Sequence, residues 1–157
     1  MYEVLNGNRT LKFSGKLLAE SSSRRVGSLR WVEFSLYKTD SGSYILARRG
    51  VSVVYHGATC SLVTRHNLEE APISELSDDA VACPDCRPTY DLPYVFPEKF
   101  RYWAQVSDNA EPVLEALYRY DEDTNTRYLT RVAQNVLEAA ADVDPTIDAI
   151  YRVEYIP

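Results

Sequence analysis

Four residues in the middle of the chain have the types and the spacing to bind one metal ion. His56 and Cys60 form a His-x3-Cys pair, and Cys83 and Cys86 form a Cys-x2-Cys pair after 22 intervening residues. A Cys-x2-Cys turn aims both thiolates at one point and needs a second pair to complete a tetrahedron. One imidazole and three thiolates favour zinc over magnesium or calcium, and four protein ligands leave no open position for a substrate. The sequence therefore predicts a structural zinc site that contributes to the folding free energy.

Other chemistries for these cysteines remain open. A disulfide framework fits poorly with three cysteines and with a start that has no signal-peptide features. A redox Cys-x-x-Cys motif normally opens a helix, which Pro88 discourages. A zinc deaminase or hydrolase is a further alternative, but a deaminase needs glutamate and proline where this chain has Ala58 and Ala82. Reduced, unligated cysteines also remain possible, and His66 could replace His56 as a ligand.

Length and composition bound the architecture that must position these residues. The chain has 157 residues, 45% of them hydrophobic and 25% charged, which is ordinary for a globular protein. We expect one domain over residues 1–157. It would comprise a β-meander (1–55), a zinc-binding insertion (56–88), and an aromatic segment followed by a helical part (89–157). The apolar runs are too short to span a membrane, so we expect no membrane association and a cytoplasmic location.

The charge is divided unevenly along the chain. Residues 1–66 carry ten Lys/Arg and four Asp/Glu, a net of +6, whereas residues 67–157 carry seven and nineteen, a net of −12. Either the halves attract one another within the fold, or each half faces a different partner. A third interpretation is that both halves are simply solvated.

Strand signals dominate the first third of the chain. Asn6-Gly7-Asn8 is a hairpin-turn signal, and Ser14-Gly15 indicates a bulge or kink. Apolar and polar residues alternate from Trp31 to Tyr37, which is typical of a half-buried antiparallel strand. The expected strands cover 2–5, 10–20, 31–37, 43–48 and 51–55, and the last of them delivers His56 to the metal.

The remainder is predicted to contain helices. A short helix is expected at 73–80, whereas the aromatic, proline-rich segment 90–103 cannot be a long helix and either packs on the core or forms a recognition surface. One helix should begin near Asp108 and end at 121–123. A second should begin at Thr124 or Thr126 and end at Asp144-Pro145, followed by a closing strand at 152–156. The predicted fold class is α+β, an antiparallel β-meander with a zinc-stapled insertion and two C-terminal helices.

Part of the meander resembles a known protein family. The segments Lys12–Glu20, Arg30–Thr39 and Gly42–Leu46 are similar to the opening part of the bacterial EXLDI family. The resemblance spans residues 12–46 and consists of a strand pattern without catalytic chemistry. It implies a β-meander in a bacterial or phage accessory protein, and it implies no site residues.

Motifs for catalysis are scarce. The chain has no Gly-rich phosphate loop, no G-x-S-x-G and no H-E-x-x-H, so an enzyme is the less favoured class. We expect instead a non-catalytic regulatory module that binds a protein partner, with the acidic second half docking a basic partner or mimicking nucleic-acid charge.

The alternative is a nucleic-acid-binding sheet. Trp31, Glu33, Ser35 and Tyr37 share one face of their strand, on which rings could stack on bases while nearby cations contact phosphates. The residues proposed for this role are Arg24, Arg25, Arg30, Trp31, Tyr37, Lys38, Tyr44, Arg48 and Arg49.

Overall fold

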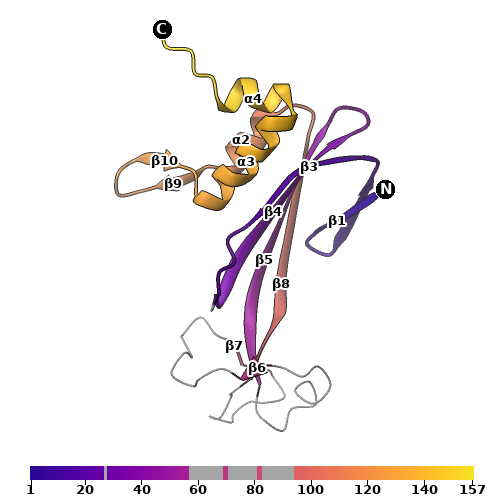
Figure 1. Cartoon of the computed structure of the whole chain (residues 1–157), viewed down its shortest axis with the longest axis vertical. Coiled ribbons are helices and arrows are strands. Elements are labelled where there is room, and N and C mark those ends of the chain that lie inside the picture. Colours follow the sequence, from indigo (N-terminus) through magenta and orange to yellow (C-terminus); the bar gives the residue numbers. More distant parts are fainter. Residues whose placement is uncertain (27, 57–68, 71–80, 83–93) are drawn as a thin grey trace. The chain divides into compact units, whose positions relative to one another are not determined.

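The computed structural model describes residues 1–26, 28–56, 69–70, 81–82 and 94–157, with side chains described outside 54–99 (Figure 1). Close contacts divide the chain into two units. The first contains Met1–Ser23, Val32–Arg49 and Tyr102–Pro157, and the second contains Arg24–Trp31 and Gly50–Arg101. The elements are mainly antiparallel strand pairs, with one parallel pair and with helices in the C-terminal part, which confirms the α+β class. No helix among the described residues is both long enough and apolar enough to cross a membrane.

Six strands form the main sheet. Their order is β3-β4-β5-β8-β6, and β7 pairs with β5. The predicted strand 31–37 lies within β4, whereas the two strands expected on either side of Gly50 form one continuous β5. The described part of the aromatic segment, 94–103, belongs to the long strand β8. The bounds are β3 (Gly15–Ser22), β4 (Arg30–Thr39), β5 (Tyr44–His56), β6 (Glu69–Glu70), β7 (Val81–Ala82) and β8 (Tyr94–Ser107).

The predicted N-terminal hairpin is present as β1 (Tyr2–Asn6) and β2 (Arg9–Phe13). Asn6 pairs with Arg9, so Gly7 and Asn8 form a two-residue loop, and the positive φ of Gly7 (61°) suits a turn with glycine at its first central position. The backbone N–H of Gly7 donates to the carbonyl of Tyr102 at 2.9 Å. The hairpin is therefore tied to β8.

The break predicted at Ser14-Gly15 separates β2 from β3. Only glycine fits here, because a Cβ at Gly15 would lie 2.2 Å from the carbonyl oxygen of Lys38. A β-bulge between Leu17 and Ala19 then leaves the adjacent residues Leu18 and Ala19 both buried. These two side chains join the core that lies under the helices.

Within the first unit the sheet has two differently covered faces. Phe34 and Leu36 of β4 and Leu46 of β5 face a core formed with the helices, which we call the helix side. Ile45 of β5 and Ala104 of β8 belong to a smaller cluster with the β1–β2 hairpin, which we call the hairpin side. The predicted alternation along β4 is thus confirmed.

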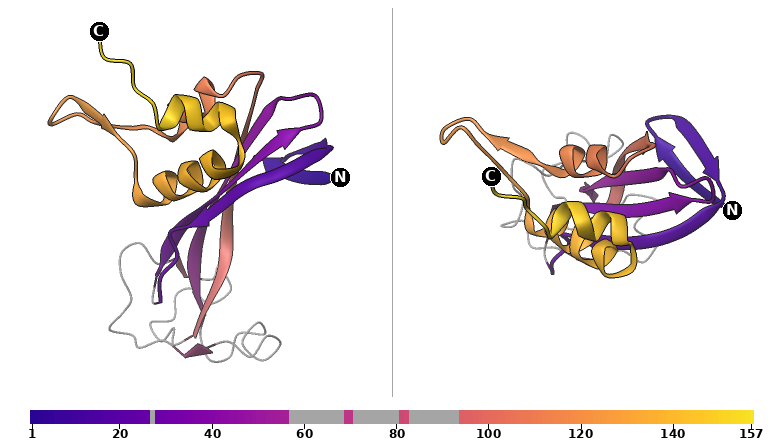
Figure 2. Two further views of the ribbon diagram at one scale, coloured as in Figure 1. Left: turned by 45° about the horizontal axis from the view of Figure 1, so that its top comes forward. Right: turned by 90° about the horizontal axis from the view of Figure 1, so that it is seen from above.

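Three C-terminal helices form, one more than predicted. They are α2 (Glu111–Leu117), α3 (Arg131–Val143) and α4 (Pro145–Tyr151), and Figure 2 shows α3 and α4 adjacent to one another beside the sheet. The prediction that Asp144-Pro145 ends the second helix is confirmed. The additional helix is α4, which Asp144 caps by accepting a hydrogen bond from the Thr146 N–H at 3.3 Å. The predicted closing strand at 152–156 is wrong, because these residues follow α4 without forming a strand.

A second two-stranded ribbon lies where the end of the first predicted helix and the start of the second were expected. It consists of β9 (Arg119–Asp121) and β10 (Thr126–Tyr128), with Thr126 paired to Asp121. The second helix therefore begins after Thr130, whose side chain accepts from the Ala133 N–H at 3.3 Å, and not at Thr124 or Thr126. The predicted helix at 73–80 lies outside the described residues.

Candidate functional site

The predicted zinc ligands fall largely outside the described residues. The residues outside the described part are Cys60, Cys83, Cys86 and the alternative ligand His66. His56 is described and is the last residue of β5. Among the described residues, no group of three or more His, Cys, Asp or Glu side chains is placed to hold a metal.

The backbone around these positions is informative. β5 and β7 run parallel, with Val54 paired to Val81 and Tyr55 paired to Ala82. Tyr55 directly precedes His56, and Ala82 directly precedes Cys83. Two of the four predicted ligands, His56 and Cys83, therefore each come one residue after the paired residues Tyr55 and Ala82. The donor set itself, one imidazole and three thiolates, suits zinc.

The predicted nucleic-acid residues of the second unit form an arginine-rich turn. Arg24, Arg25 and Arg30 are exposed, and the Arg25 carbonyl accepts from the Ser28 N–H at 3.0 Å. Trp31 is only 7% exposed, and the Arg24 guanidinium lies 4.7 Å from its ring centroid. The Trp31 ring is therefore largely covered and does not present the stacking surface that the sequence suggested.

The remaining predicted nucleic-acid residues lie in the first unit and on different faces of the sheet. Tyr37 faces the hairpin side, where its ring centroid lies 4.9 Å from that of Tyr2 and 5.1 Å from that of Phe13. Arg49 forms an ion pair with Glu33, while Tyr44 and Lys38 contact Asp144 on the helix side. Tyr44 is buried, so its ring is not available to a base either.

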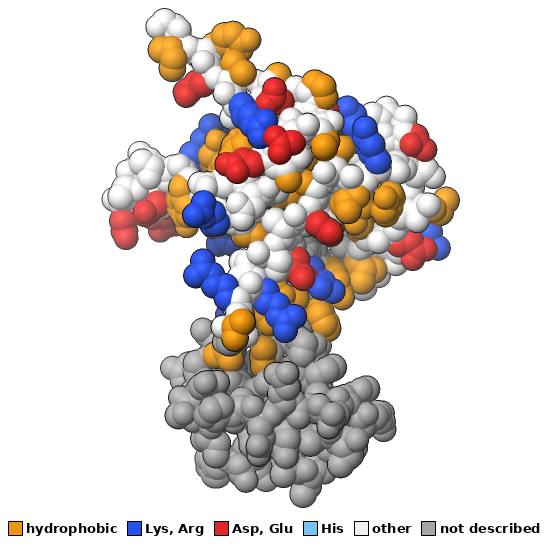
Figure 3. Space-filling view, in the orientation of Figure 1, with side chains coloured by type: hydrophobic (Ala, Val, Ile, Leu, Met, Phe, Trp, Pro, Cys, Tyr) orange, Lys and Arg blue, Asp and Glu red, His pale blue; other side chains and the backbone are white. Residues whose placement is uncertain are grey.

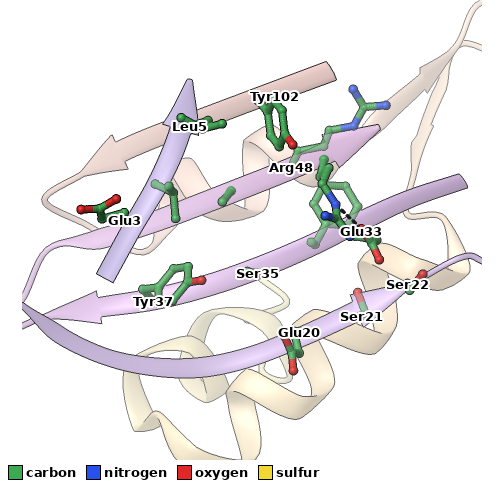
Figure 4. Close-up of a pocket in the computed structure, with 14 residues that line it drawn as sticks. Glu3, Leu5, Glu20, Ser21, Ser22, Glu33, Ser35, Tyr37, Arg48 and Tyr102 are labelled. Carbon is green, nitrogen blue, oxygen red and sulfur yellow. Dashed lines mark hydrogen bonds and ion pairs between the residues drawn. The ribbon is translucent and has the colours of Figure 1, made fainter. Parts of the chain in front are cut away.

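A groove of about 670 Å³ opens on the hairpin side (Figure 4). It carries three carboxylates, from Glu3, Glu20 and Glu33, among serine and tyrosine hydroxyls. Two of the carboxylates have partners, because Glu33 pairs with Arg49 and Glu3 pairs with Lys12 at 3.1 Å. Burial raises the pKa of Tyr37, and the nearby charge of Glu20 adds to the shift. The lining residues are Glu3, Val4, Leu5, Glu20, Ser21, Ser22, Glu33, Phe34, Ser35, Tyr37, Ala47, Arg48, Arg49 and Tyr102.

A second cavity of about 680 Å³, which we call the helix-side hollow, opens on the opposite face. Trp103 of β8 lines it and is 39% exposed, and residues of α2 and α3 line the same cavity. Arg48 and Arg119 contribute the charges, and the lining contains no carboxylate side chain. The lining residues are Ser23, Val32, Phe34, Arg48, Trp103, Ala116, Leu117, Arg119, Thr130 and Val132.

The β9–β10 ribbon, which we call the arm, projects away from the helices of the first unit (Figures 1 and 2). Tyr120 is 59% exposed and Tyr128 is 46% exposed. Arg127 holds the base of the arm, since its guanidinium donates to both carboxylate oxygens of Glu115 at 3.0 and 3.2 Å and lies 4.2 Å from the ring centroid of Tyr118.

Acidic side chains gather at the tip of the arm, which Figure 3 shows. Asp121, Glu122 and Asp123 follow one another, and Glu122 and Asp123 are exposed. Asp121 is used locally, because its side chain accepts from the Asp123 N–H at 3.0 Å and shapes the turn. The arm therefore presents two exposed tyrosines, Tyr120 and Tyr128, and two exposed carboxylates, Glu122 and Asp123.

A buried polar cluster joins the sheet to the helices. Asp144, only 3% exposed, accepts from the Tyr44 hydroxyl at 2.6 Å and from the Lys38 ammonium at 3.4 Å. Burial raises the pKa of Tyr44, and the hydrogen bond to Asp144 raises it further. Burial alone would lower the pKa of Lys38, but the hydrogen bond to Tyr44 and the charge of Asp144 outweigh it and raise the pKa. Because Asp144 also caps α4, we assign this cluster to stability.

The arm and the hollow are features that the sequence analysis missed. The polar run from Asp121 to Asn125, with tyrosines and arginines alternating on both sides, is a hairpin signal. Asn125 has a positive φ of 53°, which asparagine tolerates in tight turns. Comparison of the chain with protein-family models, curated proteins and solved structures found no match.

Proposed function

We propose that the protein is a non-catalytic, zinc-stabilised regulatory module that binds a basic partner protein through the arm. The observation that carries the proposal is the projecting ribbon with exposed Tyr120 and an acidic tip. Tyrosine supplies rigid contact area, and exposed carboxylates steer a positively charged partner to the surface. A bacterial or phage accessory role in the cytoplasm fits, because a reducing compartment keeps cysteine thiols available to zinc.

The zinc part of the proposal rests on the donor set and on the β5–β7 register. His56 and Cys83 would hold the metal together with Cys60 and Cys86, and the metal would link the ends of two parallel strands to the segment between them. Zinc supplies folding free energy at such a site and no catalytic step.

Elemental analysis of the untagged protein tests the metal. We expect one zinc per chain, lost together with cooperative unfolding in Cys86→Ser. A matched control is His66→Ala, which should keep the metal if His56 is the ligand. Metal-free protein that stays folded would overturn the zinc proposal.

Photo-crosslinking tests the partner surface. A photoreactive phenylalanine analogue at position 120 should give a discrete crosslinked product in cells, and the same analogue at exposed Val143 on α3 should not. Glu122→Lys with Asp123→Lys should abolish the product, because both exposed carboxylates become cations. A control with the same charge change, Asp40→Lys with Glu138→Lys, should retain it. The arm would be refuted as the docking surface if position 143 gave the same crosslinked product. It would also be refuted if Glu122→Lys with Asp123→Lys left the product from position 120 unchanged.

Nucleic-acid binding is the second candidate, and the exposed arginine turn at 24–30 favours it. This function predicts a salt-sensitive mobility shift of a labelled DNA or RNA strand that Arg24→Ala with Arg25→Ala abolishes. Binding through the arm instead predicts no shift and crosslinks to protein alone.

A further inference from the structure

The helix-side hollow has the composition of a site for an apolar segment that carries a carboxylate. Trp103 and Val32 supply apolar surface, and Arg119 supplies a cation in a lining without a carboxylate side chain. Arginine binds carboxylates in a planar, paired geometry, and a volume of about 680 Å³ is within the usual range for a ligand pocket. Such a hollow complements a short acidic and apolar stretch of chain.

The C-terminal tail of this same chain has that composition. After α4 the sequence runs Val153-Glu154-Tyr155-Ile156, in which Tyr155 is 90% exposed and Ile156 is 79% exposed. Within the described part of the chain, none of these four residues makes a hydrogen bond or an ion pair to another residue. The tail thus exposes two large apolar side chains next to a carboxylate.

The start of the tail is fixed although its side chains are exposed. Arg152 donates to the carboxylates of Asp142 at 2.7 Å and Asp148 at 3.2 Å, and to the carbonyl of Glu138 at 3.2 Å. Figures 1 and 2 show the tail leaving α4 on the side away from the sheet. The hollow is lined by residues of β4, β5, β8 and α2, by the base of the arm and by the first turn of α3. Arg152 contacts Glu138 and Asp142 in the second half of α3, so the tail begins away from the end of α3 that lines the hollow.

We propose that the helix-side hollow binds residues Val153–Ile156 of a second copy of this chain. The Glu154 carboxylate pairs with Arg119 at the rim, and the Tyr155 ring packs against Trp103. Each of the two chains inserts its tail into the hollow of the other, which closes a symmetric dimer. Each inserted tail covers Trp103, which is otherwise partly exposed to solvent. The inference concerns self-association and stands apart from partner binding at the tip of the arm.

Sedimentation equilibrium of the protein of residues 1–157, from low to high micromolar concentration, measures the association. We expect a monomer–dimer equilibrium that Tyr155→Ser with Ile156→Ser weakens about tenfold or more. Arg119→Glu alone and Glu154→Arg alone should each weaken it, and the double variant should restore it, because the ion pair is re-formed with reversed signs. Arg131→Glu, an exposed change on α3 outside the hollow, should leave it unchanged.

Trp103 provides an independent readout. Acrylamide quenching of its fluorescence in a Trp31→Phe background should fall as the protein concentration rises. A capped synthetic peptide of residues 152–157 should protect the ring in a tail-truncated protein. Three results would each overturn the proposal. The protein could stay monomeric at every concentration, or it could form a dimer that the tail and hollow variants do not weaken. The molecule's own tail could also protect Trp103 to the same extent at every concentration.

Discussion

Replacing Asp144 with alanine should destabilise the fold strongly, because one buried side chain satisfies three donors. The Tyr44 hydroxyl, 2.6 Å away, would lose a charged acceptor inside the core, at about 1.5–3 kcal/mol. Loss of the cap on α4 adds about 1 kcal/mol. Lys38, whose side chain is 28% exposed, can turn toward water, so we assign its lost pairing only about 0.5–1 kcal/mol. The expected loss of unfolding free energy is thus about 3–5 kcal/mol.

Urea denaturation followed by circular dichroism measures this loss. Tyr44→Phe should cost less, about 1.5–2 kcal/mol, because Asp144 keeps the other two donors. The matched control is Lys12→Met, which breaks the ion pair with Glu3 between side chains that are 62% and 59% exposed and should change stability little. An Asp144→Ala protein within about 1 kcal/mol of wild type, with an unchanged denaturant slope, would refute the assignment of this cluster to stability.

Three further predictions address pH, backbone space and the arm. Lys38 and Tyr44 have raised pKa values and bind their protons more tightly when folded, so the stability they contribute is complete below about pH 10 and is lost at higher pH. An alkaline titration of the urea midpoint checks this, and Tyr44→Phe should flatten the decline. Gly15→Ala should lower the melting temperature by several degrees, since its Cβ meets backbone atoms that cannot move aside. Arg127→Met should change global stability by less than about 1 kcal/mol, because its partner Glu115 is exposed, yet it should increase amide hydrogen exchange in the arm.

The sequence predicted the strands well where side-chain alternation and turn chemistry agree. The β1–β2 loop was predictable because Gly7 supplies the positive φ that a two-residue turn needs. The break at Gly15 was also visible, although the close approach of the Lys38 carbonyl that demands glycine depends on the pairing of β3 with β4 and could not be predicted from local sequence. The local pattern therefore predicts where a strand breaks, and the tertiary structure supplies the reason.

The helical part was predicted less accurately because apolar spacing continues past the true helix ends. Tyr128 and Leu129 fit the periodicity of α3, yet the helix begins only after Thr130 supplies the cap. Pro145 predicts the end of one helix, but Asp144 before it is a capping residue, so the same pair also begins the next helix. The hollow depends on which part of the sheet the helices leave uncovered, and no local pattern reports that.

The charge asymmetry can now be related to surfaces. Lys38 with Asp144 joins the basic and acidic halves, but Arg49 with Glu33 and Arg127 with Glu115 each lie within one half. Mutual attraction of the halves therefore does not account for the exposed carboxylates at the tip of the arm. Exposed like charges at the tip of a ribbon repel one another without stabilising the fold. This arrangement favours the interpretation in which the acidic half faces a separate partner, and it makes reversal of the charges at the tip the decisive variant for that function.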